Sequence, residues 1–114
     1  LYGLLLPSGN DAANALAEST SGSVAQFMNE LNLFLKSKGL SETHFSNPHG
    51  LHYDDHWTTA SDMAKLTRVA LKNATFREIV KTVRYLKPGT GPGTGQPAQY
   101  YSQNNRLLKP GPYY

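Results

Sequence analysis

Residues 23–39 read SVAQFMNELNLFLKSKG, and this stretch predicts a largely helical chain. Ser23 and Gln26 have the capping-box spacing that begins a helix. Apolar side chains then recur at intervals of three and four residues: Val24, Phe27, Met28, Leu31, Phe34 and Leu35. This period predicts one buried stripe along the helix. Gly39 predicts the end of the helix, because glycine adopts the left-handed conformation of a helix C-terminus without strain.

The residues before this helix also favour helical structure. Residues 11–18 are rich in alanine, and Ser8 or Asn10 can cap them, so we expect a helix followed by a loop at 19–22. The opening LYGLLL has no charged residue and no signal-peptide cleavage pattern. It predicts the last turns of a helix, and we therefore expect the chain to be part of a larger domain.

The second half of the chain continues with two more helices and a hairpin. Thr59 and Asp62 repeat the capping-box spacing and predict a long helix that ends at Asn73. Its inner face is expected to contain Met63, Leu66 and Ala70, with Val69 beside them. Thr75 predicts the start of a short helix. Strands are expected at 82–86 and 99–102, joined by a long, mobile loop at 87–97 that holds four glycines and three prolines.

These elements predict an α+β fold that is mainly helical, with a short C-terminal β-hairpin. The 114 residues are expected to form one partial domain, divided into a helical part at about 1–80 and a hairpin and loop at about 81–114. With 39% apolar and 17% charged residues, the chain is too apolar for a disordered protein. It has no apolar run that could span a membrane and no cysteine, which excludes disulfides and thiol catalysis.

The first candidate site is Ser8-Gly9-Asn10, in a turn between two apolar helical segments. A hydroxyl and a carboxamide two residues apart could relay a proton and hydrogen-bond a peptide backbone. The alternative is helix capping, because serine, glycine and asparagine are common at the start of helices.

Residues 40–58 form an irregular segment that contains all four histidines. His44, His49, His52 and His56, with Asp54 and Asp55, are of the residue types that bind zinc. Their spacing is not that of a helical zinc motif, so we expect these imidazoles to bond neighbouring backbone and expect no metal site. The loop from Gly89 to Gly95 lacks the lysine and the following helix of a phosphate-binding loop, so we expect no phosphate site either.

Charge is unevenly distributed along the chain. Residues 1–60 carry two basic and six acidic side chains, whereas residues 61–114 carry nine basic and two acidic ones. Lys65, Arg68 and Lys72 share one face of the second long helix. Such a stripe could bind an anionic partner such as nucleic acid, which leaves a small helical binding module as the alternative function. The other interpretation is the solvent face of an amphipathic helix, and we expect no nucleic-acid partner.

Several segments, in order, resemble the secreted D-alanyl-D-alanine carboxypeptidases, which are low-molecular-mass penicillin-binding proteins. The resembling segments are YGLLLPSGNDAA at 2–13, KGL at 38–40, THF at 43–45, NPHGL at 47–51, TTASDMA at 58–64 and NNRLL at 104–108. The resemblance implies a helical subdomain of a serine DD-peptidase/β-lactamase-like fold. It also implies that Ser8-Gly9-Asn10 is the Ser-x-Asn motif of that family, with Ser8 catalytic and with Asn10 and Gly9 binding substrate.

The other two motifs of this family, Ser-x-x-Lys and Lys-Thr-Gly, do not occur in the sequence. Ser61 is followed by a lysine only at the fourth position, and Lys81-Thr82 is followed by valine. The resemblance therefore implies one part of an acyl-transferring carboxypeptidase that needs no cofactor, and we expect this chain alone to be inactive. Expected partners of the intact enzyme are peptidoglycan pentapeptides ending in D-Ala-D-Ala and β-lactams, in the periplasm or cell envelope. We also expect self-association of the isolated chain, because surface that the rest of the domain covers would be exposed.

Overall fold

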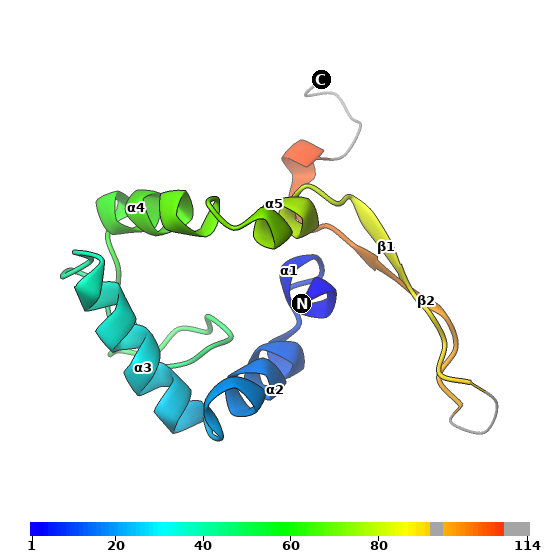
Figure 1. The fold of residues 1–114 in the computed structure, drawn as a ribbon, viewed down its shortest axis with the longest axis horizontal. Coiled ribbons are helices and arrows are strands. Elements are labelled where there is room, and N and C mark those ends of the chain that lie inside the picture. The colour runs from blue at the N-terminus through cyan, green and yellow to red at the C-terminus, as the bar shows by residue number, and fades with distance from the viewer. Residues whose placement is uncertain (92–94, 109–114) are drawn as a thin grey trace.

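The computed structural model describes residues 1–91 and 95–108 and confirms a mainly helical fold with one two-stranded sheet (Figure 1). In chain order the elements are α1 (Tyr2–Leu5), α2 (Asn10–Ser21), α3 (Val24–Ser37), α4 (Ala60–Ala70), α5 (Ala74–Val80), β1 (Arg84–Lys87), β2 (Gln99–Ser102) and the 3-10 helix η1 (Arg106–Leu108). The last residues of the expected hairpin and loop region, 109–114, lie outside the described residues.

The helices form an open arc rather than a closed bundle (Figure 1). α1 packs against both α2 and α5, and α2 packs against α3, while the hairpin projects away from the arc. The radius of gyration is 16.2 Å, whereas a compact domain of this length has about 13 Å. The chain therefore builds only a thin core of its own.

The predicted helix at residues 24–38 is confirmed as α3. The Ser23 hydroxyl accepts a hydrogen bond from the backbone N–H of Gln26 at 3.1 Å. At the other end Gly39 has a φ of +75°, and the N–H of Leu40 donates to the carbonyl of Leu35 at 3.1 Å. This pattern closes a helix with a left-handed glycine, and it buries Leu35 and Leu40 completely.

The expected loop at 19–22 is wrong, because α2 continues as helix through Ser21. The hydroxyl of Thr20 donates to the carbonyl of Leu16 at 2.7 Å, so it follows the helix rather than competing with it. Gly22 then ends α2 with a φ of +83°.

The second long helix begins as predicted, with the Thr59 hydroxyl accepting from the N–H of Asp62 at 3.1 Å. It is shorter than expected, because α4 ends at Ala70. The predicted start of the next helix at Thr75 is wrong. The Asn73 side chain accepts from the N–H of Phe76 at 3.0 Å, so Asn73 caps α5 instead of ending α4.

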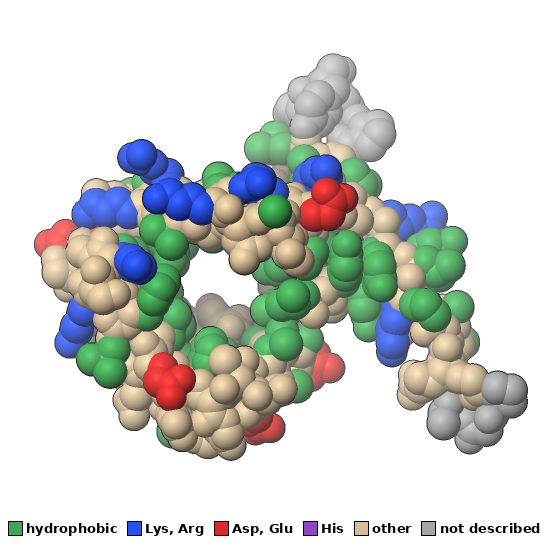
Figure 2. Space-filling view, in the orientation of Figure 1, with side chains coloured by type: hydrophobic (Ala, Val, Ile, Leu, Met, Phe, Trp, Pro, Cys, Tyr) green, Lys and Arg blue, Asp and Glu red, His purple; other side chains and the backbone are tan. Residues whose placement is uncertain are grey.

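The buried stripe on α3 and α4 is only partly confirmed. Met28 and Leu35 are buried, but Phe34 remains 42% exposed and Met63 on α4 remains 39% exposed. The space-filling view shows hydrophobic side chains gathered around a hollow at the centre of the arc (Figure 2). Because the arc is open, apolar positions that face this hollow have no opposing layer within the described part of the chain.

The predicted hairpin is confirmed, with its first strand shifted toward the C-terminus. β1 and β2 pair in antiparallel register, with Tyr85 opposite Tyr101. The tip that was expected to be mobile includes residues 92–94, which lie outside the described residues.

Candidate active site

The predicted site lies in the turn that joins α1 to α2. Leu6 is the C-cap of α1, Gly9 is the N-cap of α2, and Pro7 and Ser8 lie between them. Ser8 has a φ of +61°, and no other non-glycine residue among positions 1–91 and 95–108 has a positive φ. Left-handed backbone costs a residue with a Cβ about 1–2 kcal/mol. Such outliers gather at functional sites, which directs attention to this turn.

The side chains of Ser8 and Asn10 are exposed, and neither forms a hydrogen bond within the described residues. The prediction that Ser8 or Asn10 caps the helix is therefore wrong, and the reason is positional. The cap of α2 is Gly9, so Asn10 is already helical and Ser8 lies one residue before the cap. The hydroxyl and the carboxamide are both available to a ligand.

Gly9 lets the turn lie close against α1. Its N–H donates to the carbonyl of Gly3 at 3.1 Å. A Cβ at position 9 would lie 2.7 Å from that same carbonyl oxygen, so a larger residue would displace backbone. Glycine at this position is therefore required by close approach, since its φ of −71° would suit any residue.

A segment from the other end of the chain holds the same turn. Asn104 donates its backbone N–H to the carbonyl of Leu6 at 3.1 Å and its side-chain amide to the carbonyl of Pro7 at 3.0 Å. Sequence reasoning assigned no role to Asn104. The only available signal was its place in the resembling segment at residues 104–108.

Aromatic contacts anchor the hairpin to α1. The rings of Tyr2 and Tyr85 stack with centroids 3.8 Å apart and planes inclined by 6°. A Cβ on Gly3 would lie 3.4 Å from the Tyr101 ring, so the backbone of α1 lies against this aromatic side chain. The turn that carries Ser8 thus lies where α1, α2 and the segment after β2 meet.

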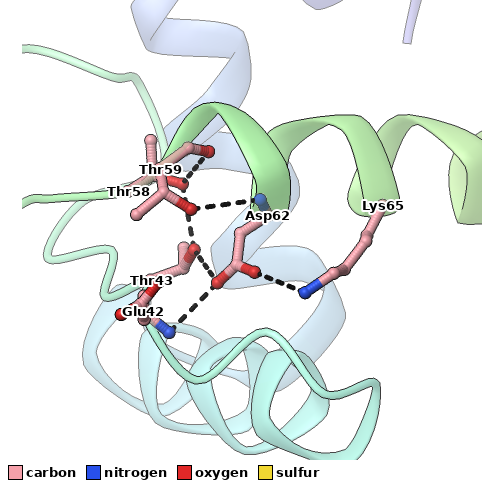
Figure 3. A network of polar contacts seen from close by, with 6 residues as sticks. All are labelled: Glu42, Thr43, Thr58, Thr59, Asp62 and Lys65. Atoms are coloured by element: carbon pink, nitrogen blue, oxygen red, sulfur yellow. Dashed lines mark hydrogen bonds and ion pairs between the residues drawn. The ribbon is translucent and has the colours of Figure 1, made fainter.

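A buried carboxylate joins α4 to the loop after α3 (Figure 3). Asp62 is 2% exposed and accepts from the N–H of Glu42, the hydroxyl of Thr43 and the ammonium of Lys65, at 3.0, 3.0 and 3.1 Å. Burial raises the pKa of Asp62, but the hydrogen bonds and the Lys65 charge outweigh it and leave the pKa below its ordinary value. The expectation that Asp62 completes the capping box with Thr59 is not met, because its carboxylate bonds this loop. The network is scaffold.

The histidines organise the irregular segment through its backbone. His44 exchanges two backbone hydrogen bonds of 2.9 Å with Trp57, and their rings stack at 4.9 Å. The Nδ1 atom of His56 accepts from the N–H of Ser46 at 3.3 Å, and that of His49 accepts from the N–H of Leu51 at 3.3 Å.

The described ranges contain no group of three or more histidine, aspartate or glutamate side chains placed to hold a metal ion. In the same ranges no helix is long and apolar enough to cross a membrane.

The basic stripe on α4 is exposed. Lys65 pairs with Asp62, so one of its three charges already has a partner in the scaffold. Arg68 is exposed on α4, whereas Lys72 is exposed two residues beyond its end, so the structure does not place all three residues on one helix. An anionic partner for this face stays the alternative hypothesis, and the expectation of no nucleic-acid partner stays a prediction. The candidate phosphate loop at 89–95 includes residues 92–94, outside the described part of the chain.

Comparison with protein families matches residues 1–109 to the D-alanyl-D-alanine carboxypeptidase model. The chain belongs to this family. Among curated members of the family, the D-alanyl-D-alanine carboxypeptidase of Streptomyces sp. (strain K15) is 38% identical over 115 residues, covering 95% of this chain and 40% of the relative. The DacF carboxypeptidase of Bacillus subtilis (strain 168) is 38% identical over 111 residues, covering 96% of this chain and 27% of the relative.

Solved structures with DD-peptidase names also superpose on this chain. The Streptomyces K15 DD-transpeptidase superposes with a TM-score of 0.86 at 35% identity, covering 95% of this chain and 44% of that structure. A D-alanyl-D-alanine carboxypeptidase from Mycobacterium tuberculosis H37Rv gives 0.82 at 30% identity, covering 95% and 39%. The chain thus spans less than half the length of these relatives and matches only part of the family fold.

Proposed function

We propose that Ser8-Gly9-Asn10 is the Ser-x-Asn part of the active site of a serine-type D-Ala-D-Ala carboxypeptidase. The observation that carries the proposal is the turn itself, in which Ser8 is held at a φ of +61° with its side chain exposed. The Asn10 carboxamide is exposed on the first residue of α2, directly after this turn. Family membership supplies the chemistry that such a turn would serve.

The reaction is acyl transfer through a covalent intermediate. A serine of the Ser-x-x-Lys motif, which this chain does not contain, attacks the carbonyl of the penultimate D-Ala. The C–N bond breaks, the terminal D-Ala leaves as an amine, and water then hydrolyses the acyl ester. Ser8 relays a proton between the lysine of that motif and the leaving amine, as a general acid–base group.

Asn10 and Gly9 have the complementary role of holding the substrate. The Asn10 carboxamide offers two donors and an acceptor, which suits a hydrogen bond to the peptide backbone of the substrate. Orientation of the scissile bond next to the nucleophile lowers the entropic part of the barrier. Gly9 permits the close approach of this turn to α1, which sets the position of both neighbouring side chains.

Substrates of this activity are peptidoglycan stem peptides that end in D-Ala-D-Ala. β-Lactams acylate the serine of the Ser-x-x-Lys motif, which also attacks these peptides. Peptidoglycan lies outside the cytoplasm, so we place the enzyme in the cell envelope or periplasm. The residues assigned here need no cofactor for acyl transfer.

Testing the proposal requires a protein that contains this chain within the whole family domain, called here the domain-length protein. Ser8→Ala should lower the rate of D-Ala release by about 100-fold or more, as the loss of a general acid–base group does. Asn10→Ala should lower it by about 100-fold or more, because the substrate loses its orientation next to the nucleophile. Ser41→Ala is the matched control, because Ser41 is an exposed serine in the loop after α3. Its turnover should equal that of the parent.

Near-normal turnover of both site variants would refute the proposal and leave Ser8 and Asn10 as ordinary turn residues. Thermal unfolding of each variant distinguishes lost chemistry from lost folding. Both side chains are exposed, so their removal should leave the melting temperature close to that of the parent.

A further inference from the structure

We propose that Asn104 is a positioning residue that holds Ser8 in its reactive conformation. The inference rests on the proposed function and adds to it a residue 96 positions further along the chain. Asn104 meets the turn with two donors at once, its N–H on the Leu6 carbonyl at 3.1 Å and its amide on the Pro7 carbonyl at 3.0 Å. These are the two residues that precede Ser8.

The strained backbone of Ser8 explains why such a contact matters. A left-handed serine persists only where its surroundings over-determine the conformation. Gly9 holds the turn from the C-terminal side, through its bond to the Gly3 carbonyl at 3.1 Å. Asn104 holds it from the N-terminal side. Ser8 therefore lies between two hydrogen-bonded anchors that come from different parts of the fold.

The segment that carries Asn104 is itself fixed. Gln103 is buried, its N–H donates to the Val83 carbonyl at 2.9 Å, and its side-chain amide donates to the Val80 carbonyl at 3.2 Å. On the other side, the Asn105 side chain accepts from the N–H of Leu107 at 3.0 Å. Residues 103–105 thus form a clasp that ties the end of α5 and the base of the hairpin to the Ser8 turn.

Asparagine suits this place because it reaches two successive carbonyls with its backbone and side-chain donors. Asn104 is exposed, so loss of its side-chain bond should cost little global stability. The same loss removes one of the constraints on Ser8. A displacement of about 1 Å in a catalytic group can lower a rate by about 100-fold. Activity should therefore respond to Asn104 more strongly than stability does.

The experiment measures acylation of the domain-length protein by a fluorescent penicillin. Asn104→Ala should slow acylation by about tenfold or more, while the affinity for the penicillin changes less than the rate constant. Asn105→Ala is the matched control, because it removes a side-chain hydrogen bond of 3.0 Å in the same segment without touching the turn. It should acylate within about twofold of the parent, with a loss of melting temperature similar to that of Asn104→Ala.

A double variant tests whether Asn104 acts through Ser8. In a Ser8→Ala background, Asn104→Ala should slow acylation no further, because residues that act as one unit are not additive. If Asn104→Ala slowed acylation in the Ser8→Ala background by the same factor as in the parent, the inference would be overturned. Parent-like acylation by Asn104→Ala alone would also overturn it. Parent-like acylation by Ser8→Ala would instead refute the proposed function.

Replacement by aspartate gives a readout that depends on pH. Asn104→Asp presents a carboxylate to the Pro7 carbonyl at neutral pH and should be as slow as Asn104→Ala. When the carboxyl protonates, near pH 4, it regains a donor for that carbonyl. The acylation rate relative to the parent at the same pH should then rise toward one. A ratio that stays flat across this range would contradict a donor role for Asn104.

Discussion

Substitution of Gly9 by alanine provides a direct test of how the turn that carries Ser8 is packed. The added Cβ would lie 2.7 Å from the Gly3 carbonyl oxygen, whereas ordinary van der Waals contact begins at 3.4 Å. The neighbour is backbone, so it cannot rotate away as a side chain would. α1 or the start of α2 must move by up to 0.7 Å, the difference between these two distances.

The expected cost follows from that overlap. Overpacking of a tight contact typically destabilises a protein by about 1–3 kcal/mol. The movement also shifts Ser8 and Asn10, which flank Gly9, so acylation by penicillin should fall by about 10- to 100-fold. Equilibrium unfolding in urea and the acylation rate of the domain-length protein measure the two effects separately.

Gly22→Ala is the matched control. Position 22 has open space around it but a φ of +83°, so alanine there should cost about 1–2 kcal/mol through backbone strain alone. Both variants should therefore lose similar stability, and only Gly9→Ala should lose acylation rate. Parent-like acylation by Gly9→Ala, or an equal loss in Gly22→Ala, would refute the reasoning.

Three further predictions concern the scaffold and the isolated chain. The lowered pKa of Asp62 implies a contribution to stability that is complete above the unfolded-state pKa and is lost as pH falls through the folded-state pKa. Asp62→Asn should therefore lower the free energy of unfolding at pH 7, measured by urea titration. The decline of that free energy below about pH 5 should be less steep in the variant than in the parent. Leu35→Ala should lower the free energy of unfolding by about 2–5 kcal/mol, because Leu35 is fully buried, whereas Leu33→Ala at a 67% exposed position should change it little. The 114-residue chain alone should form no covalent adduct with labelled penicillin, and an adduct seen by mass spectrometry would contradict the motif assignment.

Helices whose ends are set by neighbouring residues were predictable from the sequence. Ser23 and Gly39 set the ends of α3 through bonds to residues no more than five positions away. Errors arose where two polar residues competed for one role. Asn73, rather than Thr75, caps α5, and composition alone does not separate these two candidates.

The burial of apolar side chains was less predictable than the helices that carry them. Periodicity identifies the apolar face of a helix but not whether another element covers it. Phe34 and Met63 lie on predicted inner faces and remain exposed, because the chain forms an open arc. The chain covers 44% of a related DD-transpeptidase structure, and a chain that matches only part of a domain is expected to build only part of its core.

The candidate site could be found in the sequence only through an ordered set of resembling segments. Ser8-Gly9-Asn10 taken alone is typical of helix capping, and the structure bears this out for Gly9, which is the N-cap of α2, but not for the side chains of Ser8 and Asn10. The left-handed backbone of Ser8 carries no signal of its own in the sequence, since serine rarely adopts it.

The amino-acid sequence by itself determined both ends of α3, the start of α4 and which family the chain resembles, and it indicated the turn proposed to carry the family motif. These features depend on periodicity and on hydrogen bonds between residues close together in the chain. The tertiary structure alone decided how that turn is held. Asn104 reaches Pro7 across 97 positions, and Asp62 reaches Thr43 across 19. Such pairings form only after the chain has folded back on itself, because their geometry depends on every element between the two partners.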